Sequence, residues 1–271
     1  MGFLICWRIQ EIVYEFIWCM EWIMWRLAIH LRLLIINGID ISIFSAKQLR
    51  YEIEHREVNS QSEWPAALET PVMEKSTKGF KTITVAVAVY GKGKEDVIHN
   101  RSDLLAIMYE KLELELDGYS NRFECVLDKI TVKEAIKRKC HEVTLNFIGY
   151  EFGKEISINM TNTIKSITVK GNDEAPCIVE ITPSVDLASV EIDGIAYNRI
   201  SGEKETITIR NIKAGKTVII NGEDCTVLQE GLNKFADADM WEFPVLKPGT
   251  NTISCSSDKC AVTLKYKPRY V

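Results

Sequence analysis

The sequence has little histidine and no patterned cysteine. Its four histidines fall into no H-x-x-x-H or H-E-x-x-H arrangement, and its eight cysteines form none of the C-x-x-C pairs that zinc ribbons and redox sites need. We therefore predict no metal site and no cofactor. A chain of 271 residues does not need disulfides for stability, so we expect reduced cysteines that pack as small apolar side chains. Cys255 and Cys260 flank a predicted turn and could pair.

Motifs of catalysis are also missing. There is no Gly-x-Ser-x-Gly elbow, and no motif brings two of the many carboxylates together. The segment Tyr90-Gly-Lys-Gly-Lys94 lacks the spacing and the hydroxyl of a phosphate-binding loop, which favours a plain loop between a strand and a helix. We predict that the protein is not an enzyme and has no catalytic residues.

A basic stripe is absent. The chain has 33 Lys and Arg against 38 Asp and Glu, a formal net charge of −5, and the two signs are interspersed. The run from Lys133 to Lys139 is broken by Glu134 and Ala135 and is typical of a solvated strand end or turn. Proteins that bind duplexes concentrate positive charge. We therefore predict no nucleic-acid partner.

Residues 1–36 lack the long uncharged run of a membrane span, although they are strongly apolar. Glu11, Glu15 and Glu21 interrupt every window of the required length, about 18 residues, so we predict no stable span. The same carboxylates argue against a signal peptide. Two interpretations stay open: an amphipathic helix that binds an interface or a partner, or a helical extension upstream of the natural start, with Met24 as a later start. We favour the extension.

Residues 37–168 are predicted to form the first domain, a sheet with one long helix. Asn37-Gly38 is a strong hairpin signal, residues 55–79 are predicted as a long loop or projecting arm, and residues 80–90 alternate as a strand. The spacing of Leu104, Leu105, Met108 and Leu112 predicts an amphipathic helix over 95–116 with Asn100 as a cap, and strands are expected around 122–127 and 140–147.

Residues 172–271 are predicted to form a second domain, a β-sandwich. Residues 171–176 are typical of a linker, and beyond them the chain shows only short alternating runs, with turns predicted at Asp193-Gly194 and Asn221-Gly222. The predicted fold class is mainly β (α+β).

The last forty residues carry the most distinctive motif. It contains Asn233-Lys-Phe, then Trp241-Glu-Phe-Pro-Val-Leu-Lys-Pro-Gly-Thr-Asn251, then a hairpin that closes on Tyr266-Lys-Pro-Arg-Tyr270. Together with Ile181-Thr-Pro183 and the turns at 192–194 and 220–223, this motif resembles the C-terminal, galectin-like half of siphophage distal tail proteins. The resemblance extends from about residue 35 to the end.

We expect the motif to have a structural role. Pro248 presets a turn, Gly249 tolerates positive φ and Asn251 can bond its own backbone, while Trp241 and Phe243 are expected to be buried across the sandwich. The predicted structural residues are Trp241, Phe243, Pro244, Pro248, Gly249, Asn251, Tyr266, Pro268 and Arg269.

The resemblance implies a homo-oligomeric ring of about six copies at the tail tip or baseplate. Such a hub joins the tail tube to the host-adsorption apparatus, so the implied partners are the tail tube protein, the tape-measure protein and tail-associated tip proteins. The implied location is the virion tail, after synthesis in the bacterial host cytoplasm. Whether the particle belongs to a free phage, a prophage or a phage-derived particle stays open.

Two rival functions also stay open. A carbohydrate-binding adsorption module would stack a host saccharide on Trp241 or Tyr197, and an exposed Trp241 facing a groove would favour it. An enzyme of wall degradation would need a carboxylate pair in a cleft.

Overall fold

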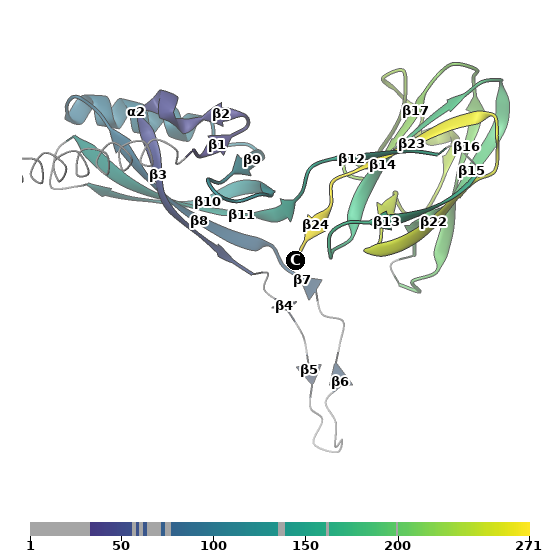
Figure 1. The fold of residues 1–271 in the computed structure, drawn as a ribbon, viewed down its shortest axis with the longest axis horizontal. Coiled ribbons are helices and arrows are strands. Elements are labelled where there is room, and N and C mark those ends of the chain that lie inside the picture. Colours follow the sequence, from purple (N-terminus) through teal and green to yellow (C-terminus); the bar gives the residue numbers. More distant parts are fainter. Residues whose placement is uncertain are drawn as a thin grey trace, which may run out of the picture. The chain divides into compact units, whose positions relative to one another are not determined.

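The computed structural model describes residues 33–55, 58–59, 62–63, 72–73, 77–134, 139–160, 163–198 and 200–271. Their contacts divide the chain into two compact units (Figure 1). The first contains the described residues up to Glu54, with Phe80–Ser120 and Glu124–Gly149. The second contains His55–Gly79, Asn121–Phe123 and Tyr150–Val271. The predicted extension, residues 1–36, lies outside the described residues except for its last four.

The sheet of the first unit has the order β2-β1-β9-β10-β11-β8-β3. Its strands are β1 (Ile35–Ile36), β2 (Ile39–Asp40), β3 (Ala46–Glu54), β8 (Lys81–Tyr90), β9 (Leu112–Glu115), β10 (Arg122–Glu134) and β11 (Cys140–Phe152), and a 3-10 helix, η1, spans Ile41–Phe44. Asn37 and Gly38 have φ of 51° and 77°, so the predicted hairpin is present.

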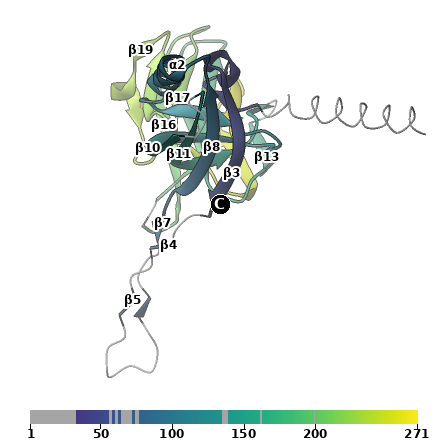
Figure 2. The same cartoon turned by 90° about the vertical axis from the view of Figure 1, so that its left-hand side faces the viewer.

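Strand β8 is the clearest success of the sequence pattern. Ile83, Val85, Val87 and Val89 are fully buried, because alternate residues of a strand point to the same face. Strand β11 pairs antiparallel with β8, and it buries Val143, Leu145 and Phe147. Strands β3 and β8 lie side by side in both views (Figures 1 and 2), with β3 at the end of the described strand order.

The helix is shorter than predicted. Helix α2 spans Lys94–Ala106, and residues 112–115 form β9 instead of its last turn. Leu112, Leu114 and Leu116 alternate with acidic residues and all three are buried, so a period of two prevails over the helical spacing. Asn100 is not the cap. It lies inside α2, where its Nδ2 donates to the Tyr90 carbonyl at 2.7 Å.

The predicted loop at 55–79 contains paired strands. Strand β4 (Val58–Asn59) pairs with β7 (Thr77–Lys78), and β5 (Ser62–Glu63) pairs with β6 (Val72–Met73). All these pairs are antiparallel and nested between β3 and β8. The described residues of segment 55–79 therefore belong to a long hairpin. Of the two structures predicted for this segment, the arm fits this pairing better than the loop.

The second unit is a sandwich of two sheets. One has the order β12-β23-β14-β17-β18-β19 with β21 beside β14, and the other has the order β13-β22-β15-β16-β20. The strands of the first sheet are β12 (Ile156–Met160), β14 (Ala175–Pro183), β17 (Val218–Asn221), β18 (Thr226–Gln229), β19 (Leu232–Asn233), β21 (Val245–Leu246) and β23 (Cys260–Tyr266). Those of the second are β13 (Ile164–Val169), β15 (Leu187–Tyr197), β16 (Lys204–Ile212), β20 (Ala238–Asp239) and β22 (Gly249–Cys255).

The sandwich core lies between the two sheets. Ile181, Val218 and Leu264 of one sheet, and Ile192 and Ile207 of the other, are fully buried members of one apolar cluster. The outermost strands of the sandwich on one side, β19 and β20, have only two residues each. They are joined by a short 3-10 helix, η2 (Phe235–Asp237).

Three details of the second unit differ from expectation. Strands β12 and β13 pair with β23 and β22, although residues 156–168 had been placed with the first domain. The last two residues of the expected linker at 171–176 belong to strand β14, and Asp173 forms a bridge with Arg269. The division into domains 37–168 and 172–271 stays a prediction.

Asp193-Gly194 forms a bulge and not a turn. Strand β15 runs through both residues, and its register against β16 shifts between Ile192 and Ala196. Gly194 has φ of 83°, and a Cβ built there would lie 2.1 Å from the Thr252 carbonyl oxygen. The Asn221-Gly222 turn between β17 and β18 is present as predicted.

We expect Gly194→Ala to destabilise the second unit by about 3 kcal/mol, because it combines an unfavourable φ with a backbone clash. Gly215→Ala is the matched control: φ is 72° there, but no atom lies within 4 Å of the added methyl, so about 1 kcal/mol is expected. Urea unfolding measures both. Equal losses would show that the clash has no effect.

Candidate functional site

Asn251 organises the loop that leads into β22. Its side chain is almost fully buried, and its Nδ2 donates to the carbonyls of Lys247 at 2.7 Å and Gly249 at 3.2 Å. Its Oδ1 accepts from the Lys247 backbone N–H at 3.3 Å. Gly249 has φ of 88°, as the turn requires. The predicted role of Asn251 in bonding its own loop is therefore present.

Tyr197 joins the same hydrogen-bond network. Its hydroxyl donates to Asn251 Oδ1 at 3.3 Å and lies 3.3 Å from the Gly194 carbonyl. The Lys247 ammonium lies 3.8 Å from the centroid of the Tyr197 ring, a cation–π contact. Burial raises the pKa of the Tyr197 hydroxyl. One face of this ring is thus already occupied, which makes Tyr197 a poor platform for a sugar.

Phe243 and Pro244 hold the middle of the loop against the sandwich. Phe243 packs against the apolar core and stacks on Phe235, with ring centroids 6.0 Å apart. The Pro244 carbonyl accepts from the Cys177 N–H at 3.1 Å. A Cβ on Gly222 would lie 2.1 Å from that carbonyl oxygen, so the glycine allows the loop to approach closely.

Trp241 is exposed, contrary to the expectation that it is buried across the sandwich. Its exposed fraction is 90%, whereas the neighbouring Met240 and Phe243 pack against the core. The bend between β20 and β21 turns these neighbours inward and leaves the indole in solvent. An aromatic side chain presented in this way on an anchored backbone is typical of a binding contact.

The segment after β23 is fixed by backbone hydrogen bonds. Strand β24 (Arg269–Tyr270) pairs with residues 151–152 of β11, and the Pro268 carbonyl accepts from the Gly153 N–H at 2.8 Å. The Arg269 carbonyl accepts from the N–H groups of Asn172 and Asp173. Tyr266 is buried, and its hydroxyl accepts from the Lys170 N–H at 3.2 Å. Backbone or side-chain hydrogen bonds thus hold Tyr266, Pro268 and Arg269 in place, and their structural role stays a prediction.

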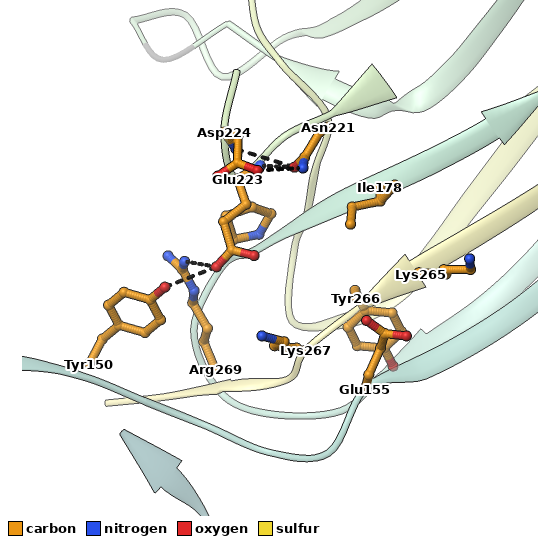
Figure 3. Close-up of a pocket in the computed structure, with 11 residues that line it drawn as sticks. Tyr150, Glu155, Ile178, Asn221, Glu223, Asp224, Lys265, Tyr266, Lys267 and Arg269 are labelled. Atoms are coloured by element: carbon orange, nitrogen blue, oxygen red, sulfur yellow. Dashed lines mark hydrogen bonds and ion pairs between the residues drawn. The ribbon is translucent and has the colours of Figure 1, made fainter. Parts of the chain in front are cut away.

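A polar cavity of about 180 Å³ lies beside this segment (Figure 3). Glu223 points toward Tyr150 and Arg269: it accepts from the Tyr150 hydroxyl at 2.9 Å and lies 3.6 Å from the guanidinium. The Arg269 guanidinium also covers the Tyr150 ring at 4.0 Å. Lys265 faces Glu180 at 2.6 Å, which raises the pKa of the Lys265 ammonium.

The charges of this cavity neutralise one another. Glu223 is held by a hydroxyl and a cation, an arrangement typical of a structural ion pair. Among the described residues, no group of three or more His, Cys, Asp and Glu is arranged to hold a metal ion. Within the same residues, no helix is long and apolar enough to cross a membrane.

Comparison with known families matches residues 170–270 to the siphovirus-type tail component, C-terminal domain. The second unit contains a siphovirus tail component domain. The family predicted from the closing motif is thereby confirmed, and so is the prediction of a phage tail component. The matched residues include the Asn251 loop, the exposed Trp241 and the segment through Arg269. A search among curated proteins found no similar sequence.

Solved structures show that the fold of this tail component extends beyond the matched domain. The crystal structure of SPP1 Dit, described as a hub adsorption apparatus in phages that infect Gram-positive bacteria, is 12% identical. It aligns over 88% of this chain and 99% of that chain with a TM-score of 0.70. The phage P2 baseplate in its activated conformation with Ca is also 12% identical, covering 88% and 97% with a TM-score of 0.52. The mainly β fold class is confirmed.

Sequence reasoning missed two residues of the second unit. Tyr150 and Glu223 form the side of the cavity that receives Arg269, and they are 73 positions apart. The Asn-Gly-Glu turn at 221–223 was recognised only as a turn. A long-range pair of this kind leaves no periodic signal in one sequence.

We expect Asn251→Ala to destabilise the domain by about 3 kcal/mol, because it removes a buried amide and leaves the backbone N–H and carbonyl of Lys247 without these partners. Asn159→Ala is the control. It removes one exposed side-chain hydrogen bond, from Thr263 at 3.0 Å, and should cost less than about 1 kcal/mol. Chemical unfolding of both variants measures the difference, and similar losses would contradict the role assigned to Asn251.

Proposed function

We propose that this protein is a distal tail protein, a structural hub that closes into a ring and joins the tail tube to the adsorption apparatus. The match of residues 170–270 to the tail component domain carries the proposal. The fold likeness to SPP1 Dit, over 88% of this chain, supports it. The role is mechanical and not catalytic, since the closing motif and the cavity are held by structural hydrogen bonds and ion pairs.

The sheet of the first unit supports assembly with neighbouring copies. Strand β3 ends the described order on one side. On the other side β9 has four residues against thirteen in β10, so β9 cannot cover the whole length of β10. A neighbour's strand added beside β3 or beside β10 would extend the sheet through backbone hydrogen bonds. If the β3 side of one copy pairs with the β10 side of the next copy, the contact is heterologous. Repeating the rotation that relates the two copies can close a ring.

Strand β10 also carries two exposed valines. Val126 and Val132 are 49% and 37% exposed, and their even spacing places them on one face of the strand. In a ring of about six copies, these side chains would be covered by the adjacent subunit. The partners are then further copies of this chain, the tail tube protein, the tape-measure protein and tail-associated tip proteins. The ring would be made in the host cytoplasm and act in the virion tail.

The full chain should elute at the mass of about six copies in light scattering, with rings in negative-stain images. Val132→Asp should shift the mass toward the monomer, because it buries an unpaired carboxylate in the contact. Val185→Asp is the control: this valine is 42% exposed in the second unit, and its substitution should leave the mass unchanged. A monomer at high concentration in the unmodified chain would contradict the hub.

The exposure of Trp241 favours a second candidate, a carbohydrate-binding adsorption module. An indole in solvent can stack on a saccharide ring. Tyr197, the other proposed stacking residue, has Lys247 over its ring. Trp241 is therefore the better candidate of the two.

A glycan array probed with the full chain tests this second candidate. If Trp241 stacks on a sugar, Trp241→Ala should weaken the bound signal by about tenfold or more. Ile200→Ala, which truncates an apolar side chain with 97% exposure elsewhere in the same unit, should leave the signal unchanged. Lack of binding by the unmodified chain, or full binding by the Trp241 variant, would count against the module.

A further inference from the structure

Cys255 and Cys260 lie at the two ends of the connection between the sheets of the sandwich. Cys255 is the last residue of β22 and Cys260 is the first residue of β23. Their cross-strand neighbours differ: Cys255 pairs with Ile192 of β15, and Cys260 pairs with Pro183 of β14. A covalent bond between these two cysteines would tie one sheet to the other.

The thiols of Cys255 and Cys260 both lie close to Ser257. The Cys255 thiol donates to the Ser257 carbonyl, with a sulfur–oxygen distance of 3.5 Å, and the Cys260 sulfur is hydrogen-bonded by the Ser257 side chain. The two cysteines also line one cavity of about 360 Å³, together with Met160, Thr163 and other residues of this corner. The side chains are therefore gathered at one place, with space around them for a change of rotamer.

We propose that Cys255 and Cys260 form an intramolecular disulfide when the protein leaves a reducing compartment for an oxidising one. Both cysteines are free thiols in the structure. The bond is a modification of the assembled protein and is independent of the tail-hub role. It would fasten the two sheets of the sandwich at a corner where only four residues, 256–259, connect them.

The oxidant is a small disulfide such as glutathione disulfide. The thiolate of Cys260, the more exposed of the two, attacks one sulfur of the oxidant, forming a mixed disulfide and expelling one glutathione thiolate. The thiolate of Cys255 then attacks the Cys260 sulfur and expels the second glutathione. The two protons released by the cysteines are taken up by the two glutathione thiolates, so two thiols are oxidised and one disulfide is reduced.

The chemical setting makes this reaction slow at neutral pH and faster in base. Burial raises the pKa of both thiols, and for Cys260 the nearby Cys255 raises it further. Because the thiolate is the attacking species, the rate of bond formation should increase as pH rises from about 7 to 9. Cys125 and Cys177 are buried more deeply, which raises the pKa of the Cys125 thiol to about 12 and also raises that of Cys177. They should therefore stay unreacted.

The test incubates the folded full chain with glutathione disulfide, blocks the remaining thiols with iodoacetamide, and digests it with trypsin. Cleavage after Lys234, Lys259 and Lys265 separates the cysteines, since Lys247 precedes a proline and is not cut. A disulfide joins peptides 235–259 and 260–265 in one species about 2 Da lighter than the sum of the two reduced peptides. In the unmodified chain the melting temperature should rise by about 2–6 °C on oxidation.

The control variant is Cys225→Ser, which removes an exposed thiol of the same unit and should leave the linked peptides unchanged. Cys260→Ser should abolish both the linked species and the rise in melting temperature, and Cys255→Ser provides a second variant if the first does not fold. Recovery of 235–259 and 260–265 as separate alkylated or glutathionylated peptides would overturn the proposal. Linkage only between different molecules would overturn it as well.

Discussion

The sandwich depends on one buried side-chain amide. Asn251 satisfies the backbone of the loop 247–249, accepts from Tyr197, and lies at the start of a strand whose next inward residues, Ile253 and Cys255, enter the core. A buried amide is tolerated only when its donors and acceptors are matched, and the loop supplies both. Once this loop is fixed, Phe243 and Pro244 have definite positions and Trp241 is directed outward.

Patterns with a short period could be predicted from the sequence. The alternation of residues in β8 correctly predicted which face of the strand is buried. The turn was predicted from the conformational freedom of Gly249 and the hydrogen-bonding capacity of Asn251. The helix end was misjudged because Leu104, Met108 and Leu112 fit a helical spacing as well as Leu112, Leu114 and Leu116 fit a strand. When both periods fit, only the tertiary partner of the segment decides between them, and here that partner is β1.

Properties that depend on distant neighbours could not be predicted in this way. The burial of a tryptophan is set by what packs over it, so aromatic character alone led to the wrong expectation for Trp241. The contact of Tyr150 with Glu223 joins two segments that have no common pattern. The family resemblance supplied what periodicity could not, since it placed the whole closing motif in one known type of domain.

The strands at the edges of the sheets differ in length between the two units, and this difference bears on solubility. On one side the sandwich ends in the two-residue strands β19 and β20, which offer too few backbone groups for another chain to extend the sheets. On the other side it ends in β12 and β13, of five and six residues. In the sheet of the first unit, the nine-residue β3 ends the described order on one side, and towards the other side the four-residue β9 is shorter than its thirteen-residue neighbour β10. In a closed ring of subunits, both sides of every first-unit sheet are paired with a neighbour. An open row of subunits keeps one unpaired sheet edge at each end. Each unpaired edge is a site for aggregation until the ring closes.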